Sequence, residues 1–394
     1  MIIKYIRKLK SADINLKYFL VGVLLVGINN GILTTTFNNY LHDVFLMDAQ
    51  QRGFLEFPRE FPGFILIAVT GVLARYSIRS WSVLVGIFSG FGIFGLAYFS
   101  PSVYIMSFWM ILWSMGDHLF MPVENTMGLY LAKDGKHGKR LGQISGARNL
   151  SMIFGAMIVY AVAYFLSDGI FYRVIYSIAT ITAVLSIVAF RKVHIHDDKN
   201  SVKRKFIFRK KYTVYYLLNI LFGARKQIFL TFGPWVLVTV YGTTPETMAL
   251  LIMTASLAGV IFRQYFGIFV DKFGEKPMFI IDAAILFFIC AGFAFIKNVY
   301  FLYFLLILDN LMFATRIART TYLKKIAVNA NEIPATISLG ITMDHFVSMT
   351  IPFLGGMIWS GFGYKYVFLT ASILSFFSLF TALKVNSRSD GNYS

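Results

Sequence analysis

The stretch GIFVDKFGEKP at residues 267–277 is a short polar segment between two long apolar runs. The apolar runs cover residues 246–269 and 277–297, and each has about the 20 residues that an α-helix needs to cross a bilayer. Asp271 supplies a charge that lipid does not tolerate, and Gly274 favours a turn. We therefore predict two membrane helices joined by a tight polar loop.

The same alternation of apolar runs and short polar turns continues along the whole chain. No run alternates with period two as a membrane β-strand would, so we predict an all-α membrane protein. The twelve predicted spans are residues 17–40, 54–74, 81–100, 102–131, 141–166, 169–190, 213–241, 246–269, 277–297, 299–322, 333–358 and 364–384.

The composition excludes other classes of protein. Of the 394 residues, 57% are hydrophobic and 14% are charged, whereas an ordinary soluble domain has about 25% charged residues. Soluble, disordered and fibrous proteins are therefore excluded. The single cysteine, Cys290, excludes a disulfide framework and a cysteine-rich metal site. We predict no cofactor and no bound metal.

The basic residues predict the orientation. The chain has 37 Lys and Arg residues against 19 Asp and Glu residues, a net charge of +18. If the N-terminus is cytoplasmic, the loop cations collect on the cytoplasmic side, which follows the positive-inside rule. We therefore predict that both termini are cytoplasmic, that the membrane is a prokaryotic inner membrane, and that nucleic acid is not a partner. The loop cations predicted on the outer side of the membrane are Arg52, Arg173, Lys297 and Lys365.

The chain divides into two similar halves. Shifting the sequence by 192 positions places Asp117-His118-Leu119 on Asp309-Asn310-Leu311. We predict an N-terminal six-helix bundle at residues 1–190 and a basic cytoplasmic linker at 191–212. The C-terminal six-helix bundle, with its short cytoplasmic tail, is predicted at 213–394.

At this point the sequence resembles the major facilitator superfamily of transporters. The loop at residues 267–277 matches the family pattern G-x-x-x-D-[RK]-x-G-x-[RK], which the resemblance implies is a gating motif. The resemblance also implies two pseudo-symmetric six-helix bundles and transport by alternating access. In the equivalent first-half loop, Arg75 replaces the acid and Ile78 replaces the glycine. The residues that match the gating motif are Gly267, Asp271, Lys272, Gly274 and Lys276.

Several charged residues lie within the predicted spans. A charge there is costly unless it is paired or faces water, so such residues are candidates for function. Burial and like charge raise a carboxyl pKa, which would suit a proton carrier, although a structural ion pair is an equal alternative for Glu56 and Glu60. The candidates for proton coupling are Glu56, Glu60, Asp117, Glu124 and Asp344.

Polar residues on five predicted helices are candidates for solute binding. Asn30, Thr34 and Asn38 share one helix face by their i, i+4, i+8 spacing, either to bind the solute or to join helices. Arg225 and Lys226 are adjacent, so one carboxylate cannot neutralise both, and one of them is a candidate for an anionic group. The full set is Asn30, Thr34, Asn38, Asp117, His118, Glu124, Arg148, Arg225, Lys226, Asp309 and Arg316.

The leading hypothesis is a secondary active transporter that moves a small solute, with protons as the coupling ion. The intramembrane cations favour an anionic or polyhydroxylated metabolite. Abundant Phe, Tyr and Met would also suit multidrug efflux, which is the alternative within this class. A membrane-embedded enzyme or a lipid flippase is less favoured, because the chain has no metalloprotease motif and no nucleophile elbow. The expected partners are the solute, lipid and protons, and we expect a monomer.

Overall fold

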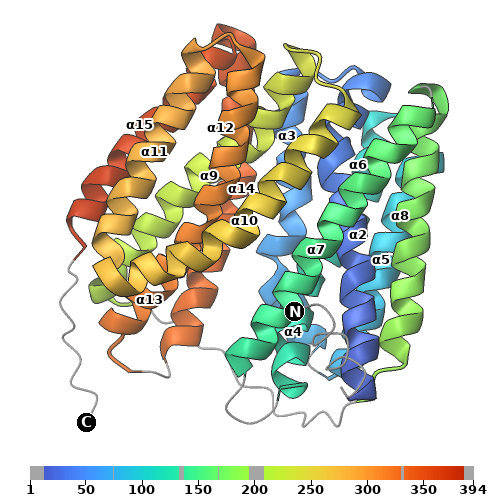
Figure 1. Ribbon diagram of the computed structural model, residues 1–394, viewed down its shortest axis with the longest axis horizontal. Coiled ribbons are helices and arrows are strands. Elements are labelled where there is room, and N and C mark those ends of the chain that lie inside the picture. Colours follow the sequence, from blue (N-terminus) through green and yellow to red (C-terminus); the bar gives the residue numbers. More distant parts are fainter. Residues whose placement is uncertain are drawn as a thin grey trace. The chain divides into compact units, whose positions relative to one another are not determined.

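The computed structural model describes residues 13–73, 75–132, 137–166, 168–194, 208–329 and 332–385. These residues form helices joined by short turns, and no strand occurs in the described ranges (Figure 1). The helices are α2 (Ile14–Phe45), α3 (Ala49–Phe64), α4 (Leu66–Leu73), α5 (Ile78–Tyr98), α6 (Val103–Tyr130), α7 (His137–Phe165), α8 (Asp168–Arg191), η1 (Lys210–Tyr212), α9 (Thr213–Thr239), α10 (Pro245–Phe273), α11 (Glu275–Phe295), α12 (Val299–Met312), η2 (Phe313–Thr315), α13 (Arg316–Ile326), α14 (Ile333–Phe362) and α15 (Tyr364–Leu383).

Each predicted span corresponds to a helix or to a broken helix. The second span is broken into two helices, α3 and α4, and α3 contains Pro58 and Pro62. Proline removes a backbone donor and weakens the helix around it. The tenth span divides at η2 into α12 and α13. Within the described ranges, nine helices are long and apolar enough to cross a membrane.

Local sequence signals explain where the helices begin and turn. Ser77 and Asn298 precede α5 and α12, and the side chain of each accepts a hydrogen bond from a backbone N–H of the first turn. Gly274 separates α10 from α11 with φ of +80°, and Gly363 separates α14 from α15 with φ of +95°. Glycine adopts these values without steric cost, so both connections are a single residue long.

The described residues form two compact units. The first contains residues 13–40, 65–194 and 245–253. Its core is built around Phe19, Leu119 and Phe190, all of which are fully buried. Within this unit α2 and α7 approach closely at Gly31 and Gly155, where a Cβ atom would lie within 2.3 Å of the opposite backbone. Small residues at such crossings are typical of packed membrane helices.

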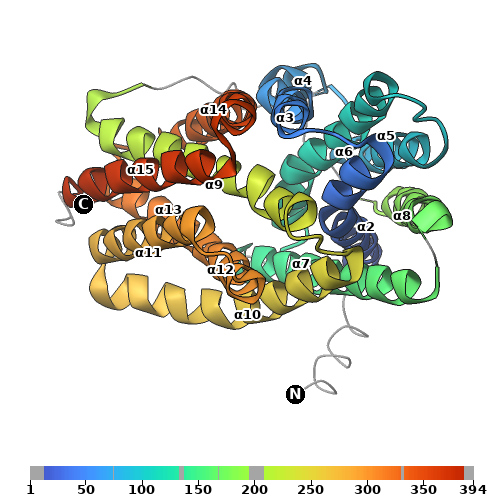
Figure 2. The ribbon, with the colours of Figure 1, turned by 90° about the horizontal axis from the view of Figure 1, so that it is seen from above.

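The second unit contains residues 41–64, 208–244 and 254–385. In it α9 packs against α14, α15 and α12, and α11 packs against α15 (Figure 2). Helix α3 belongs to this unit, although it precedes the linker in sequence, and it packs along α14. The two helices meet at Gly53 and Gly356, which again leave room for the opposite backbone. The division of the chain at a central linker stays a prediction.

The described ends of the predicted linker are fixed to helices. Arg191 ends α8, and residues 195–207 lie outside the described residues. At the other end, Arg209 and Tyr212 hold the carboxylate of Glu332, which precedes α14. The Arg209 Nε–Glu332 Oε2 distance is 2.8 Å, and the Tyr212 hydroxyl lies 2.6 Å from the same oxygen. The start of α9 is thus joined to the start of α14.

Candidate functional site

Three consecutive residues of α9 each bind a different helix. Successive residues of an α-helix point about 100° apart, because a turn has 3.6 residues. Arg225, Lys226 and Gln227 therefore extend in three directions from one turn. Their partners are Asp309 on α12, Asp344 on α14 and Glu56 on α3, respectively. Three neighbours in sequence thus connect four helices of one unit.

Arg225 and Asp309 form a fully buried ion pair. Their side chains are 2% and 1% exposed. Asp309 Oδ2 and Arg225 Nε have no hydrogen-bond partner among the described residues. A cavity of about 20 Å³ beside them is lined by Asp282 and Arg319, and this volume suffices for one water molecule. Asp282 on α11 lies against this cavity.

Lys226 and Asp344 form a second pair with a different environment. Lys226 Nζ lies 2.7 Å from Asp344 Oδ2, and the two side chains are 14% and 30% exposed. Gly223, one turn earlier on α9, makes room for the carboxylate, since a Cβ atom there would lie 2.3 Å from Asp344 Oδ1. The sequence predicts that Arg225 or Lys226 faces the solute, but in this structure each has its own carboxylate.

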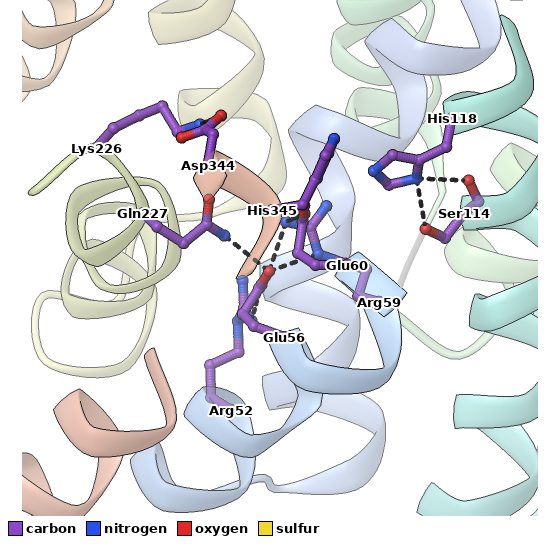
Figure 3. A network of polar contacts seen from close by, with 10 residues as sticks. All are labelled: Arg52, Glu56, Arg59, Glu60, Ser114, His118, Lys226, Gln227, Asp344 and His345. Atoms are coloured by element: carbon purple, nitrogen blue, oxygen red, sulfur yellow. Dashed lines mark hydrogen bonds and ion pairs between the residues drawn. The ribbon is translucent and has the colours of Figure 1, made fainter. Parts of the chain in front are cut away.

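Glu56 on α3 lies at the centre of a larger polar network (Figure 3). It is fully buried and accepts hydrogen bonds from Arg52, Arg59 and Gln227, at 2.5, 2.7 and 2.9 Å. Glu56 is therefore bonded to two arginines of its own helix and to one glutamine of α9.

Glu60 lies one turn further along α3. Arg59 binds it at 2.9 Å, and His345 Nδ1 lies 3.1 Å from its Oε2 (Figure 3). His345 follows Asp344 on α14, so two adjacent residues of α14 bind α3 and α9. Sequence reasoning did not include His345 among the candidates for binding. Its position directly after Asp344, within a span, is the signal that would have identified it.

The first unit has its own intramembrane pair, between α6 and α7. Arg148 Nη1 lies 2.8 Å from Glu124 Oε2, and the side chains are 31% and 12% exposed. His118 lies on the same helix as Glu124, and its Nδ1 is 2.9 Å from the carbonyl oxygen of Ser114 (Figure 3). The Ser114 hydroxyl lies 3.1 Å from the same nitrogen, so Ser114 holds His118 to its own helix. Asp117 beside it is half-buried.

The polar face predicted on α2 is only partly accessible. Thr34 is exposed, Asn30 is half-buried and Asn38 is buried. Asn30 Oδ1 is buried and has no hydrogen-bond partner among the described residues. On the opposite side, Asn29 donates to the carbonyl of Ala179 on α8 at 3.1 Å. Asn29 thus joins helices, whereas the Thr34 side chain is exposed.

Arg316 lies at the interruption of the tenth span. It begins α13 directly after η2, and its side chain is exposed. No ion pair involves Arg316 within the part of the chain that the structure describes. Interrupted membrane helices expose backbone N–H groups at depth, and transporters use such positions to bind anionic groups.

The predicted gating motif lies at the junction of α10 and α11. Asp271 and Lys272 are exposed at the end of α10, while Gly267, Gly274 and Lys276 are half-buried. The carboxylate that is buried here is Glu275, which is 1% exposed and lies 2.8 Å from Lys325 Nζ. Sequence reasoning missed Glu275. Its position at the first turn of α11, beside the turn glycine, is the signal that could have found it.

These features define a class of protein: a multi-pass helical membrane protein with charged pairs inside its spans and an interrupted helix, as in secondary transporters. The chain belongs to the Major Facilitator Superfamily, whose family model matches residues 19–327 and 215–392. The predicted family and fold are thereby confirmed, and the protein is a multi-pass integral membrane transporter.

One curated relative is similar over part of the chain. The multi-drug resistance efflux pump PmrA of Streptococcus pneumoniae is 31% identical over 163 residues. That match covers 38% of this chain and 38% of the relative, so the chain spans well under half the length of the curated relatives it matches.

Solved structures share the fold over nearly the whole chain. A substituted form of the nucleoside transporter NupG has a TM-score of 0.78 at 14% identity, covering 95% of this chain and 100% of that chain. A bacterial homologue of the iron transporter ferroportin, in an inward-facing state, has a TM-score of 0.75 at 14% identity, covering 95% and 99%. The D-xylose-proton symporter has a TM-score of 0.74 at 17% identity, covering 96% and 98%. At these identities the likeness is one of fold.

Proposed function

We propose that this protein is a proton-coupled secondary transporter that moves an anionic or polyhydroxylated metabolite by alternating access. The observation that carries the proposal is the Lys226–Asp344 pair, which is charged, lies within the spans and is only partly buried. A fully buried pair stabilises one conformation, whereas a partly exposed pair is accessible to a proton and to a solute. Of the candidate carboxylates, Asp344 is therefore our first choice for the proton.

The coupling follows from charge balance. When Asp344 binds a proton it loses its charge, and Lys226 is left without a counter-ion. An anionic group of the solute then replaces the carboxylate as the partner of Lys226. Proton and anion therefore favour each other's binding, which corresponds to a favourable (negative) coupling free energy between two sites. Arg316, exposed at the start of α13, supplies a second positive charge for the solute.

The pair between Glu124 and Arg148 is the corresponding candidate in the first unit. Its side chains are also partly exposed, and a proton on Glu124 would release Arg148 in the same way. Asp117, His118 and the accessible part of the α2 face, Asn30 and Thr34, remain proposed solute contacts. Asn38, which is buried, is the weaker member of that face.

The test is uptake into proteoliposomes with an imposed pH gradient. We expect accumulation that a protonophore abolishes. Asp344→Asn should bind the solute but lose gradient-driven accumulation, because asparagine cannot carry the proton. Asp43→Asn, the same change on an exposed residue at the end of α2, is the matched control. Transport that is indifferent to pH and protonophore would refute the coupling.

The solute itself is best found by a thermal-shift screen of metabolites, since a bound ligand stabilises the folded state by mass action. An anion that raises the stability of the wild type should raise the stability of the Arg316→Gln variant much less. An anion that stabilises this variant as strongly as the wild type would exclude Arg316 from the site.

The loop at residues 267–277 is proposed as a gate rather than a binding site. Asp271→Ala is expected to slow transport while solute binding is retained, because Asp271 is exposed at the junction of α10 and α11, outside the apolar runs. Equal transport rates in the variant and the wild type would contradict the assignment.

A second candidate is multidrug efflux, which the partial similarity to PmrA favours. A cationic, lipophilic compound would compete with Lys226 for Asp344 instead of binding Lys226. In that case Asp344→Asn should abolish stabilisation by the compound, while Arg316→Gln leaves it unchanged. The two variants thus distinguish an anionic metabolite from a cationic drug.

A further inference from the structure

The degenerate first-half loop borders a groove that the transport proposal does not use. The groove has a volume of about 680 Å³ and lies within the first unit, between the end of α4, the start of α5 and the end of α8. Leu73, Val83 and Leu84 form its apolar part, while Arg79, Ser80 and Arg191 form its polar part. One end is thus basic and hydroxylated, and the other is hydrocarbon.

The backbone around the polar end is held in place. The Trp81 indole N–H donates to the carbonyl of Leu73 at 2.8 Å, which ties α5 to the end of α4. Ser77 caps α5, and its hydroxyl lies 3.0 Å from the hydroxyl of Ser80. Arg79 donates to the carbonyl of Arg191. The groove is therefore a built feature of three helix ends.

Two arginines at this groove form no ion pair with the part of the chain that the structure describes. No carboxylate of the described residues pairs with Arg79 or Arg191, unlike Arg52, Arg148 and Arg225. Arg75 and Lys192 flank the same helix ends and contact the rings of Tyr76 and Tyr18. Guanidinium groups at a membrane surface are strong binders of phosphate.

We propose that this groove binds an anionic phospholipid, with the phosphate between Arg79 and Arg191 and an acyl chain along Leu73, Val83 and Leu84. The basic end provides charge complementarity to the headgroup. The apolar part distinguishes a lipid from a free phosphate ion, which would leave these side chains uncovered. Arg75, which stands where the family pattern has an acidic residue, adds no carboxylate that would repel the headgroup.

The test is thermal unfolding of the full-length protein in nanodiscs of phosphatidylcholine, with and without phosphatidylglycerol. We expect phosphatidylglycerol to raise Tm of the wild type. The double variant R79Q/R191Q should lose at least half of this increase. Arg173→Gln, at the opposite end of α8, is the matched control and should retain it.

Two further measurements distinguish binding of a whole lipid from binding of a headgroup alone and from a folding defect. Val83→Trp keeps both arginines but fills the apolar part, so it should also reduce the increase in Tm. Inorganic phosphate or glycerol phosphate should not reproduce the increase in phosphatidylcholine discs. An unchanged response in R79Q/R191Q, or a full response to inorganic phosphate, would overturn the proposal. Because lipid binding is measured without transport, the outcome is independent of the proposed solute.

Discussion

Arg225 and Asp309 are 2% and 1% exposed, whereas Lys226 and Asp344 keep 14% and 30% of their side-chain surface accessible. The difference arises from one step of 100° around α9, which turns Arg225 into the helix packing and Lys226 towards its edge. Removing the carboxylate partner of Arg225 should therefore affect the protein differently from removing the partner of Lys226.

We predict that Asp309→Asn lowers the stability of the folded protein by about 3–5 kcal/mol, because it leaves Arg225 charged and buried without a counter-ion. Asp344→Asn should cost clearly less, since water still reaches Lys226. The measurement is the unfolding transition of the two variants in the same detergent. Equal losses in both would show that exposure does not separate the two pairs.

Sequence reasoning identified the charged residues of the site but not their pairing. Arg225 and Asp309 are 84 positions apart, and nothing local in either segment specifies the other. The pairing results from helix packing, as does the choice of Glu275 over Asp271 as the buried carboxylate near the gating motif. Polar residues in a span predict that partners exist. Which residues those partners are depends on how the helices pack.

At the scale of helices, α3 and α14 are joined by backbone proximity as well as by charge. A Cβ atom on Gly53 would lie 2.3 Å from the carbonyl oxygen of Pro352. That oxygen belongs to the backbone and cannot move aside alone. We predict that Gly53→Ala destabilises the protein by about 1–3 kcal/mol, because the two helices must separate.

The matched control for this prediction is Gly361→Ala near the end of α14, where a Cβ atom would have no neighbour within 4 Å. Its stability should be unchanged or slightly increased, because alanine favours helix more than glycine does. The comparison uses Tm in a common detergent. A Gly53→Ala protein as stable as the control would mean that the α3–α14 contact is adaptable.

The junction of η1 with α14 predicts a pH dependence. Hydrogen bonds from Arg209 and Tyr212 lower the pKa of Glu332 from its ordinary 4.5 to about 2. The ionised carboxylate therefore stabilises the folded state above about pH 4.5, and this contribution disappears as the pH falls towards 2. We expect the Tm difference between the wild type and Glu332→Gln to shrink over that range. A difference that stays constant with pH would contradict this role.

At the scale of the whole chain, the predicted orientation can be tested because Cys290 is the single cysteine and is buried. Lys297 and Lys384 are both exposed, and the prediction places them on opposite sides of the membrane. In intact cells, a membrane-impermeant maleimide should label Lys297→Cys and spare Lys384→Cys until the cells are opened. The reverse labelling would invert the proposed topology, and the wild type is the unlabelled control.

The number and length of the spans follow from hydropathy, because lipid requires long apolar helices. The predicted span 81–100 corresponds to α5, Ile78–Tyr98, and the predicted span 364–384 corresponds to α15, Tyr364–Leu383. The interruptions after Phe64 and at Phe313–Thr315 were not predicted. Hydropathy averages over a whole span, so a break of a few residues leaves the average unchanged.

The three bonds made by Arg225, Lys226 and Gln227 also restrict how α9 can move. They point in different directions within one turn, so rotation of the helix about its own axis would strain all of them at the same time. Pro234 lies seven residues beyond Gln227 in the same helix and has no backbone N–H to donate. Movement of α9 should therefore occur as bending near Pro234, with the charged turn carried as a rigid piece.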